Sequence, residues 1–164
     1  MSSDKDFAQI IRPNIRQLLP PQKSSMPWRE LDTVGVRVKF GVPASGIPDF
    51  LALVGDSADN IPGLEGVGPK TAAKWIKDFG SLENIVKRAS WIKPERFQKI
   101  VAENAEKLFR NLTLVRFDLS HSAEGISPAR PDFAGVLDFL ETMQMKRSVS
   151  AFKKFAFEQY QIKL

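Results

Sequence analysis

Two pairs of aspartates are spaced so that each pair could bind a metal ion. Asp56 and Asp59 stand three positions apart, so on a helical turn both carboxylates would face one side. Asp4 and Asp6 stand two positions apart, so at a strand end both would point the same way. Like charges at this range repel one another, and a divalent cation removes the conflict. Two such ions held by carboxylates can cleave a phosphodiester. For an isolated Asp-x-x-Asp, however, a plainer interpretation stays open, in which Asp56 ends a helix and Asp59 caps a turn.

The residues that follow favour a partner that carries phosphate. Three glycines permit a tight hairpin that a partner can approach closely, namely Gly63, Gly66 and Gly68. The amides at the start of the next helix, which opens at Pro69, are free to meet an anion. Three lysines follow roughly on one side of that helix, namely Lys70, Lys74 and Lys77. Such contacts would be with a nucleic-acid backbone and would not depend on base sequence.

The same stretch nearly matches a nucleotide-binding P-loop, Gly-x-x-x-x-Gly-Lys-Ser/Thr. Pro69 shifts Lys70 by one position and removes an amide that the phosphate cradle needs. No strand is predicted before the loop either. We therefore reject nucleotide binding.

The composition narrows the chemistry of any metal site. The chain has 164 residues, no cysteine and one histidine, His121. Thiolate sites are therefore excluded and a single imidazole argues against a histidine cage, so we expect a metal to bind oxygen, as Mg²⁺ or Mn²⁺ does. The formal charge of +5 is compatible with a nucleic-acid partner. No apolar run approaches the roughly 18 residues of a membrane span, and the first residues do not resemble a signal peptide. We expect no membrane partner.

The apolar periodicity predicts a mostly helical chain. The expected helices cover residues 28–40, 48–54, 69–79, 82–89, 94–115, 132–143 and 148–160. Residues 1–11 suggest a strand end that runs into a short helical turn, 14–19 an extended piece, and 117–131 an irregular segment. Trp75 is expected in the core, and Lys107 on a solvated helix face.

Two segments resemble the 5′-nuclease family, which includes the 5′→3′ exonuclease domain of bacterial DNA polymerase I, its stand-alone relatives and the flap endonucleases. The segments are "SSDKDFAQII" and "PDFLALVGDSADNIPGLEGVGPKTAAKWIKDFGSLENI". The combined motif, Asp-x-x-Asp-Asn-hydrophobic-Pro-Gly followed by Gly-hydrophobic-Gly-x-Lys-Thr-Ala, is highly specific. The match covers the C-terminal half of that family.

The resemblance implies a mainly α fold. We expect a helix-three-turn-helix DNA-binding domain over residues 48–164, with a helix-hairpin-helix at about 61–80. Residues 1–47 would be a remnant of the α/β (PIN-like) catalytic domain. Asp4 and Asp6 match the carboxylate pair on the family's catalytic sheet, and Asp56 and Asp59 match its last pair. All four are therefore expected to be catalytic ligands of two Mg²⁺ or Mn²⁺ ions.

The resemblance also implies roles for the hairpin. It would hold the backbone of duplex DNA through Gly63, Gly66, Gly68, Lys70, Thr71 and Lys74. A K⁺ ion would bind the main-chain carbonyls of Pro62, Leu64 and Val67, between the turn and a DNA phosphate.

The implied function is metal-dependent hydrolysis of phosphodiesters at DNA 5′ ends and flaps. The substrate would be double-stranded DNA with a 5′ end or flap, and the protein partner a DNA polymerase or an N-terminal half. Family members carry the first catalytic strands ahead of the Asp-Lys-Asp motif, so we expect this chain to be the DNA-binding C-terminal part, incomplete by itself. The alternative is a non-catalytic, structure-selective module that binds duplex DNA. A bacterial-type enzyme of this kind would be cytoplasmic and associated with the nucleoid.

Overall fold

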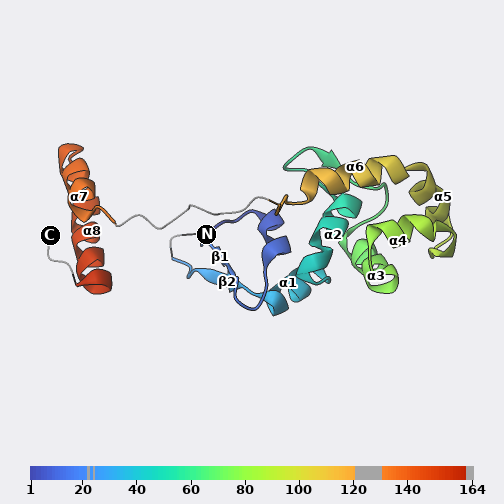
Figure 1. Ribbon diagram of the computed structural model, residues 1–164, viewed down its shortest axis with the longest axis horizontal. Coiled ribbons are helices and arrows are strands. Elements are labelled where there is room, and N and C mark those ends of the chain that lie inside the picture. The colour runs from blue at the N-terminus through green and yellow to red at the C-terminus, as the bar shows by residue number, and fades with distance from the viewer. Residues whose placement is uncertain (22, 24, 121–130, 162–164) are drawn as a thin grey trace. The chain divides into compact units, whose positions relative to one another are not determined.

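The computed structural model describes residues 1–21, 23, 25–120 and 131–161 and is shown in Figure 1. The chain forms two compact units, Met1–Asp118 and Leu119–Leu164. Both are mainly helical, as predicted, and the described strands are short. The boundary expected between residues 47 and 48 falls inside the first unit and stays a prediction. Most of the irregular segment expected at 117–131 lies outside the described residues.

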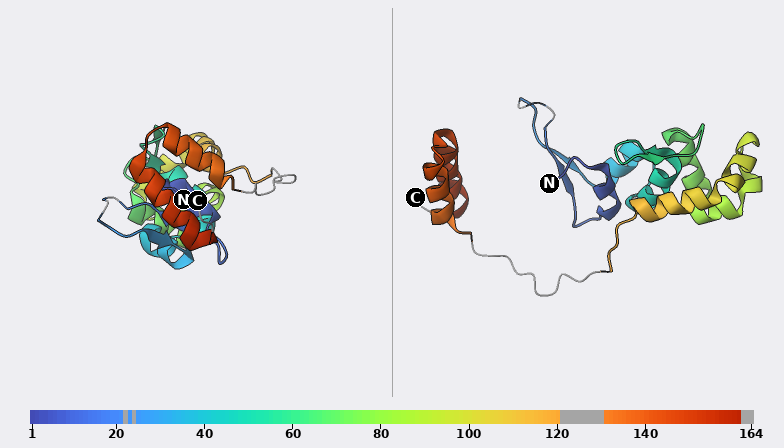
Figure 2. Two further views of the ribbon diagram at one scale, coloured as in Figure 1. Left: turned by 90° about the vertical axis from the view of Figure 1, so that its left-hand side faces the viewer. Right: turned by 90° about the horizontal axis from the view of Figure 1, so that it is seen from above.

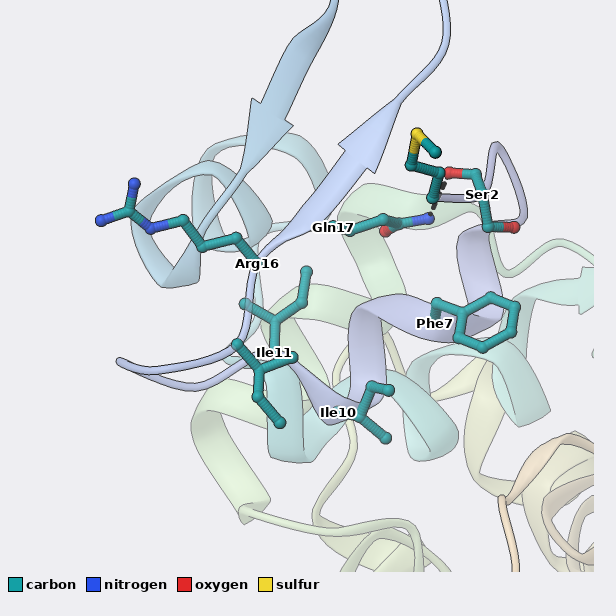
Figure 3. A pocket seen from close by; sticks show the side chains of 8 residues that line it. Ser2, Phe7, Ile10, Ile11, Arg16 and Gln17 are labelled. Carbon is teal, nitrogen blue, oxygen red and sulfur yellow. Dashed lines mark hydrogen bonds between the residues drawn. The ribbon is translucent and has the colours of Figure 1, made fainter. Parts of the chain in front are cut away.

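The first unit begins with a 3₁₀ helix, η1 (Lys5–Ile10), and a small sheet. Strand β1 (Gln17–Leu19) pairs antiparallel with β2 (Arg29–Leu31). The side-chain amide of Gln17 donates to the carbonyls of Ser2 and Asp4, at 3.0 and 2.6 Å, and so fixes the segment that leads into η1. An apolar hollow of about 180 Å³ lies between η1 and β1, and Figure 3 shows Phe7, Ile10 and Ile11 around it.

Helix α1 (Thr33–Phe40) begins later than predicted. Residues 29–31 form β2 instead, because Asp32 ends the strand and caps α1 by accepting a hydrogen bond from the Gly35 amide at 2.7 Å. The buried face of α1 is narrow. Val34 and Val38 are 65 % and 82 % exposed, whereas Val36 is fully buried.

Helix α2 (Ile47–Val54) is the centre of the first unit. Every residue from Ile47 to Leu53 is buried, including Asp49, which matches the prediction of a short buried helix. It packs against α3 (Pro69–Phe79) and α6 (Ala105–Val115), as Figure 1 shows. Between α2 and α3 the chain forms a hairpin of two very short strands, β3 (Gly55–Asp56) and β4 (Ile61–Pro62).

The remaining helices of this unit close the core. After α3 come α4 (Leu82–Lys87), η3 (Ala89–Trp91), α5 (Arg96–Glu103) and α6; a further 3₁₀ turn, η2 (Ala44–Gly46), precedes α2. The single helix predicted over 94–115 was wrong, because the chain breaks at Asn104. There the side-chain amide of Asn104 donates to the Ile100 carbonyl at 2.8 Å. Trp75 is buried in the core, as predicted.

The second unit is a pair of helices, α7 (Phe133–Thr142) and α8 (Lys146–Tyr160), which lie side by side in Figures 1 and 2. Phe133, Phe152 and Tyr160 make aromatic contacts between them, with ring centroids 5.9 and 5.0 Å from Phe133. No helix in the described part of the chain is long and apolar enough to cross a membrane.

Candidate metal and nucleic-acid site

The β3–β4 hairpin positions Asp56 and Asp59. Asp56 lies in β3 opposite Ile61, and residues 57–60 form the connecting turn, with Asn60 at a positive φ of 56°. The helical turn predicted for these aspartates was therefore wrong. The turn is held instead by Asp56 itself, whose Oδ1 accepts a hydrogen bond from the Ala58 amide at 3.0 Å.

The 3₁₀ helix η1 positions Asp6, and the strand end predicted for Asp4 and Asp6 was wrong. Asp4 is the N-cap of η1, and its Oδ1 accepts a hydrogen bond from the Asp6 amide at 3.0 Å. Asp4 is exposed, whereas Asp6 is half-buried. The helix therefore turns the two carboxylates to different surroundings.

Asp6, Asp56 and Asp59 form a carboxylate cluster. One oxygen from each lies within 4.8 Å of the other two. Ligand oxygens bound to one small divalent cation at about 2.0–2.6 Å have such separations, so the three could share an ion. Asp6 Oδ1 is buried and has no hydrogen-bond partner in the described structure, which a cation would supply. The structure thus brings together three of the four predicted ligands and leaves Asp4 out of this group.

The surroundings of the carboxylate cluster favour a bound cation, because they disfavour the negative charge of Asp6. Burial first, and then the nearby carboxylates of Asp4, Asp56 and Asp59, together raise the pKa of Asp6 to about 6, although Lys5 acts to lower it. Burial also acts to raise the pKa of Asp56. There the hydrogen bonds from the Lys5 ammonium and the Ala58 amide prevail, and the pKa of Asp56 lies below its ordinary value.

Lys5 is the cation that the cluster already has. Its Nζ lies 2.6 Å from Asp56 Oδ1; the Asp56 side chain is 1 % exposed and that of Lys5 is 35 % exposed. An open hollow of about 670 Å³ adjoins this pair and is also lined by Ser57, Asn60 and Gly63. A substrate or ion could therefore reach Asp56 from this side. The sequence analysis assigned Lys5 no role.

The turn at residues 63–68 follows directly and is held by its apolar residues. Leu64 and Val67 are 4 % and 6 % exposed, which leaves Gly66 and Gly68 on the surface. Gly66 has a φ of +73° and faces Phe97, so a side chain there would be strained. Gly68 has open space around it, whereas a Cβ at Gly63 would collide with the Val54 carbonyl. Gly63 is therefore explained by close packing within the fold.

Helix α6 ties this turn to the carboxylate hairpin. The buried side-chain amide of Asn111 donates to the carbonyls of Ala52 and Pro62, at 3.2 and 2.9 Å. Lys107 Nζ donates to the Gly63 carbonyl at 2.8 Å, so its predicted place on a solvated face was wrong. Of the carbonyls proposed for K⁺, that of Pro62 accepts from Asn111 and that of Leu64 from the Val67 amide at 3.0 Å.

The predicted DNA-binding lysines meet in a basic hollow of about 540 Å³. Lys70, Thr71 and Lys74 line it from α3, and Gly66 lines it from the turn. Two cations from a distant segment complete it, Lys93 and Arg96. Neither Lys93 nor Arg96 could be predicted, since nothing in the sequence indicates that residues 93–96 lie beside α3. Lys77 lies elsewhere, in a hollow with Arg37.

Fold and site together define a mainly helical unit that carries an acidic cluster suited to a metal ion and a basic hollow. A profile of the family described as "5′-3′ exonuclease, C-terminal SAM fold" matches residues 42–127. The chain belongs to this 5′-3′ exonuclease family.

Similar proteins agree with this membership. The chain is 39 % identical over 147 residues to a 5′-3′ exonuclease of Aquifex aeolicus, and the match covers 88 % of this chain and 48 % of that protein. It is 33 % identical over 157 residues to DNA polymerase I of Rhizobium leguminosarum, covering 92 % and 15 % respectively. A solved structure of T5 5′-exonuclease with bound zinc ions superposes with a TM-score of 0.61 at 25 % identity, over 70 % of this chain and 41 % of that one. The chain thus spans about half the length of the Aquifex exonuclease and a smaller share of the other two proteins.

Proposed function

We propose that this chain is the DNA-binding and metal-carrying C-terminal part of a 5′→3′ exonuclease or flap endonuclease. The observation that carries the proposal is the convergence of Asp6, Asp56 and Asp59, from two remote segments, in the same compact unit as the basic hollow. Family membership and the divalent zinc in the T5 5′-exonuclease structure support it.

In this proposal the carboxylates bind Mg²⁺ or Mn²⁺. Asp6, Asp56 and Asp59 each offer an oxygen to one ion. Asp4 adds negative charge nearby and would be a ligand of the second ion. A metal in this position supplies activation of water and stabilisation of the leaving oxygen during phosphodiester hydrolysis. The residues of the chain hold the site together: Asp4 caps η1, and the Ala58 amide and Lys5 orient Asp56.

The turn and the basic hollow bind the duplex. Gly66, Gly68, Lys70, Thr71 and Lys74 contact the phosphate backbone, with Gly63 shaping the turn. Lys93 and Arg96 extend the positive surface. The carbonyls of Pro62, Leu64 and Val67 hold a K⁺ ion as a helix-hairpin-helix does. Because α6 joins this turn to the β3–β4 hairpin, DNA held at the turn is positioned relative to the carboxylates.

The substrate in this proposal is double-stranded DNA with a 5′ end or flap. The similarity to a DNA polymerase I makes a polymerase a candidate partner, in the same chain or as a separate protein. A bacterial-type enzyme with this substrate would work in the cytoplasm at the nucleoid.

A second candidate function is a non-catalytic module that binds duplex DNA. It is favoured by Asp4 lying outside the carboxylate cluster. Both candidates predict duplex binding, whereas metal binding at Asp6, Asp56 and Asp59, with or without cleavage by the chain alone, separates them.

The experiment is incubation of the purified chain with a 5′-flap duplex in Mg²⁺ and then in chelator. Cleavage that requires Mg²⁺ and is lost in Asp56→Asn supports the nuclease. Duplex binding with neither cleavage nor Mn²⁺ binding that depends on Asp56 supports the second candidate. Absence of both binding and cleavage contradicts the two proposals together.

A further inference from the structure

The carboxylate cluster holds an ammonium group where a metal would be expected. Lys5 Nζ lies 2.6 Å from Asp56 Oδ1, close enough for a strong charge-assisted hydrogen bond. Asp56 is the most buried of the three carboxylates. A buried carboxylate needs a partner, and Lys5 is the cation that the described structure gives it.

The same contact obstructs metal binding. A cation that binds Asp6, Asp56 and Asp59 must share the Asp56 carboxylate with Lys5 or displace it, and the two positive charges repel each other at this range. Asp6 Oδ1 is meanwhile buried and without a partner, so Lys5 does not satisfy the whole cluster. The arrangement holds Asp56 in place but leaves part of the cluster open to a second cation.

The Lys5 side chain can move away from Asp56. Its side chain is 35 % exposed, whereas that of Asp56 is 1 % exposed. It lines the open hollow of about 670 Å³ together with Ser57 and Asn60, so a displaced ammonium can turn into solvent without unfolding η1. Asp56 cannot move in the same way, since it is fixed in β3 and by the Ala58 amide.

We infer that Lys5 is an exchangeable internal counter-ion: it pairs with Asp56 in the metal-free protein and is displaced when a divalent cation binds. Lys5 thereby sets the metal affinity of the carboxylate cluster and prevents Asp56 from being left unpaired. The ammonium that metal releases stays at the mouth of the hollow, where it can pair with an incoming phosphate. This inference rests on the proposed metal site.

The test measures Mn²⁺ binding to the full chain, and electron paramagnetic resonance of the free ion monitors the binding. We expect Lys5→Gln to bind Mn²⁺ about tenfold more tightly than wild type, which corresponds to about 1.4 kcal/mol. Lys5→Arg keeps the cation and should retain the wild-type affinity. Lys87→Gln removes the same charge from an exposed pair with Glu83 on α4 and should also leave the affinity unchanged.

A second measurement needs no variant. In lysine-ammonium ¹⁵N–¹H NMR of the wild-type chain, the paired Lys5 should give a protected signal that disappears when Mg²⁺ is added, while Lys87 should not respond. A Lys5 signal unaffected by saturating Mg²⁺ would overturn the inference, whether or not the variants fold.

The outcomes separate this inference from the proposed function. Equal or weaker Mn²⁺ affinity in Lys5→Gln overturns the role of Lys5 while the metal site stands, provided that Asp56→Asn loses binding. Undiminished Mn²⁺ binding in Asp56→Asn overturns the metal site, and the role of Lys5 with it.

Discussion

At the scale of single residues, the site is held by buried polar groups whose partners come from distant parts of the chain. Asp56 pairs with Lys5, and Asn111 bonds the carbonyls of Ala52 and Pro62. Such contacts decide where the carboxylates and the turn lie, because buried polar groups must be satisfied. Each is therefore a point at which one substitution has a specific consequence.

Asn111→Ala should destabilise the first unit by about 2–3 kcal/mol. The substitution removes two hydrogen bonds from α6 and leaves a small void in a site that is 1 % exposed. Thermal or urea unfolding of the full chain measures the loss. The matched control is Thr113→Ala on the same helix, which removes an exposed hydrogen bond to the Phe109 carbonyl and should cost under about 0.5 kcal/mol. Equal losses in the two variants would contradict the role given to Asn111.

Asp49 should make stability depend on pH. The residue is 8 % exposed, and burial raises the pKa of its carboxyl group, although the Leu82 amide and Arg116 act in the opposite direction. Because the unfolded chain loses this proton at lower pH than the folded chain, the free energy of unfolding should fall as pH rises above the ordinary value of about 3.9. The contribution cannot exceed about 1.4 kcal/mol per pH unit. In urea melts at several pH values above this one, the free energy of unfolding of Asp49→Asn should decline less than that of the wild type. An unchanged decline would contradict the role given to Asp49.

At the scale of elements, short irregular pieces position the site, and the regular helices support them. The 3₁₀ helix η1 carries Lys5 and Asp6, the β3–β4 hairpin carries Asp56, and the turn at 63–68 precedes α3. Helix α6 bonds both of the latter. The relation between carboxylates and turn is thus a property of the packed unit.

The basic hollow is an element-scale feature, and its cations should contribute to duplex binding independently of base sequence. Lys70→Ala and Arg96→Ala should each weaken binding and reduce the slope of log K against log salt by about one. Titration of a labelled duplex at several salt concentrations measures this slope. Lys77→Ala is the control on the same helix, because Lys77 lines a different hollow, and it should leave the slope unchanged. A larger loss in Lys77→Ala than in Lys70→Ala would place the DNA on another face.

Sequence reasoning succeeded where the signal is local and failed where tertiary contacts decide. The proline start and buried face of α2 and α3 were predictable. The break at Asn104 was not, because apolar spacing runs through it while the backbone of Asn104 leaves the helical conformation, with φ −105° and ψ 15°. Two-residue strands such as β3 and β4 carry no periodicity of their own. The closeness of Asp56 to Asp59 was predicted for the wrong reason, since a hairpin and a helical turn both return the chain after three residues.

At the scale of the whole molecule, membership of the 5′-3′ exonuclease family and the site agree. The chain is basic, with a formal charge of +5, yet it gathers three carboxylates within 4.8 Å of one another. Under the proposed function, positive charge attracts the phosphate backbone over a distance, and a metal at the carboxylates would let the same backbone come close to them. The positive charge and the carboxylates would then serve one substrate.

The most direct test of the central claim is the Mn²⁺ affinity of the full chain and of its four Asp→Asn variants, measured at one pH and ionic strength. We predict that Asp6→Asn, Asp56→Asn and Asp59→Asn each lose about tenfold or more in affinity, and that Asp4→Asn, whose carboxylate caps η1 outside the carboxylate cluster, loses much less. Four equal affinities, or a loss confined to Asp4→Asn, would contradict the claim that Asp6, Asp56 and Asp59 form the metal site.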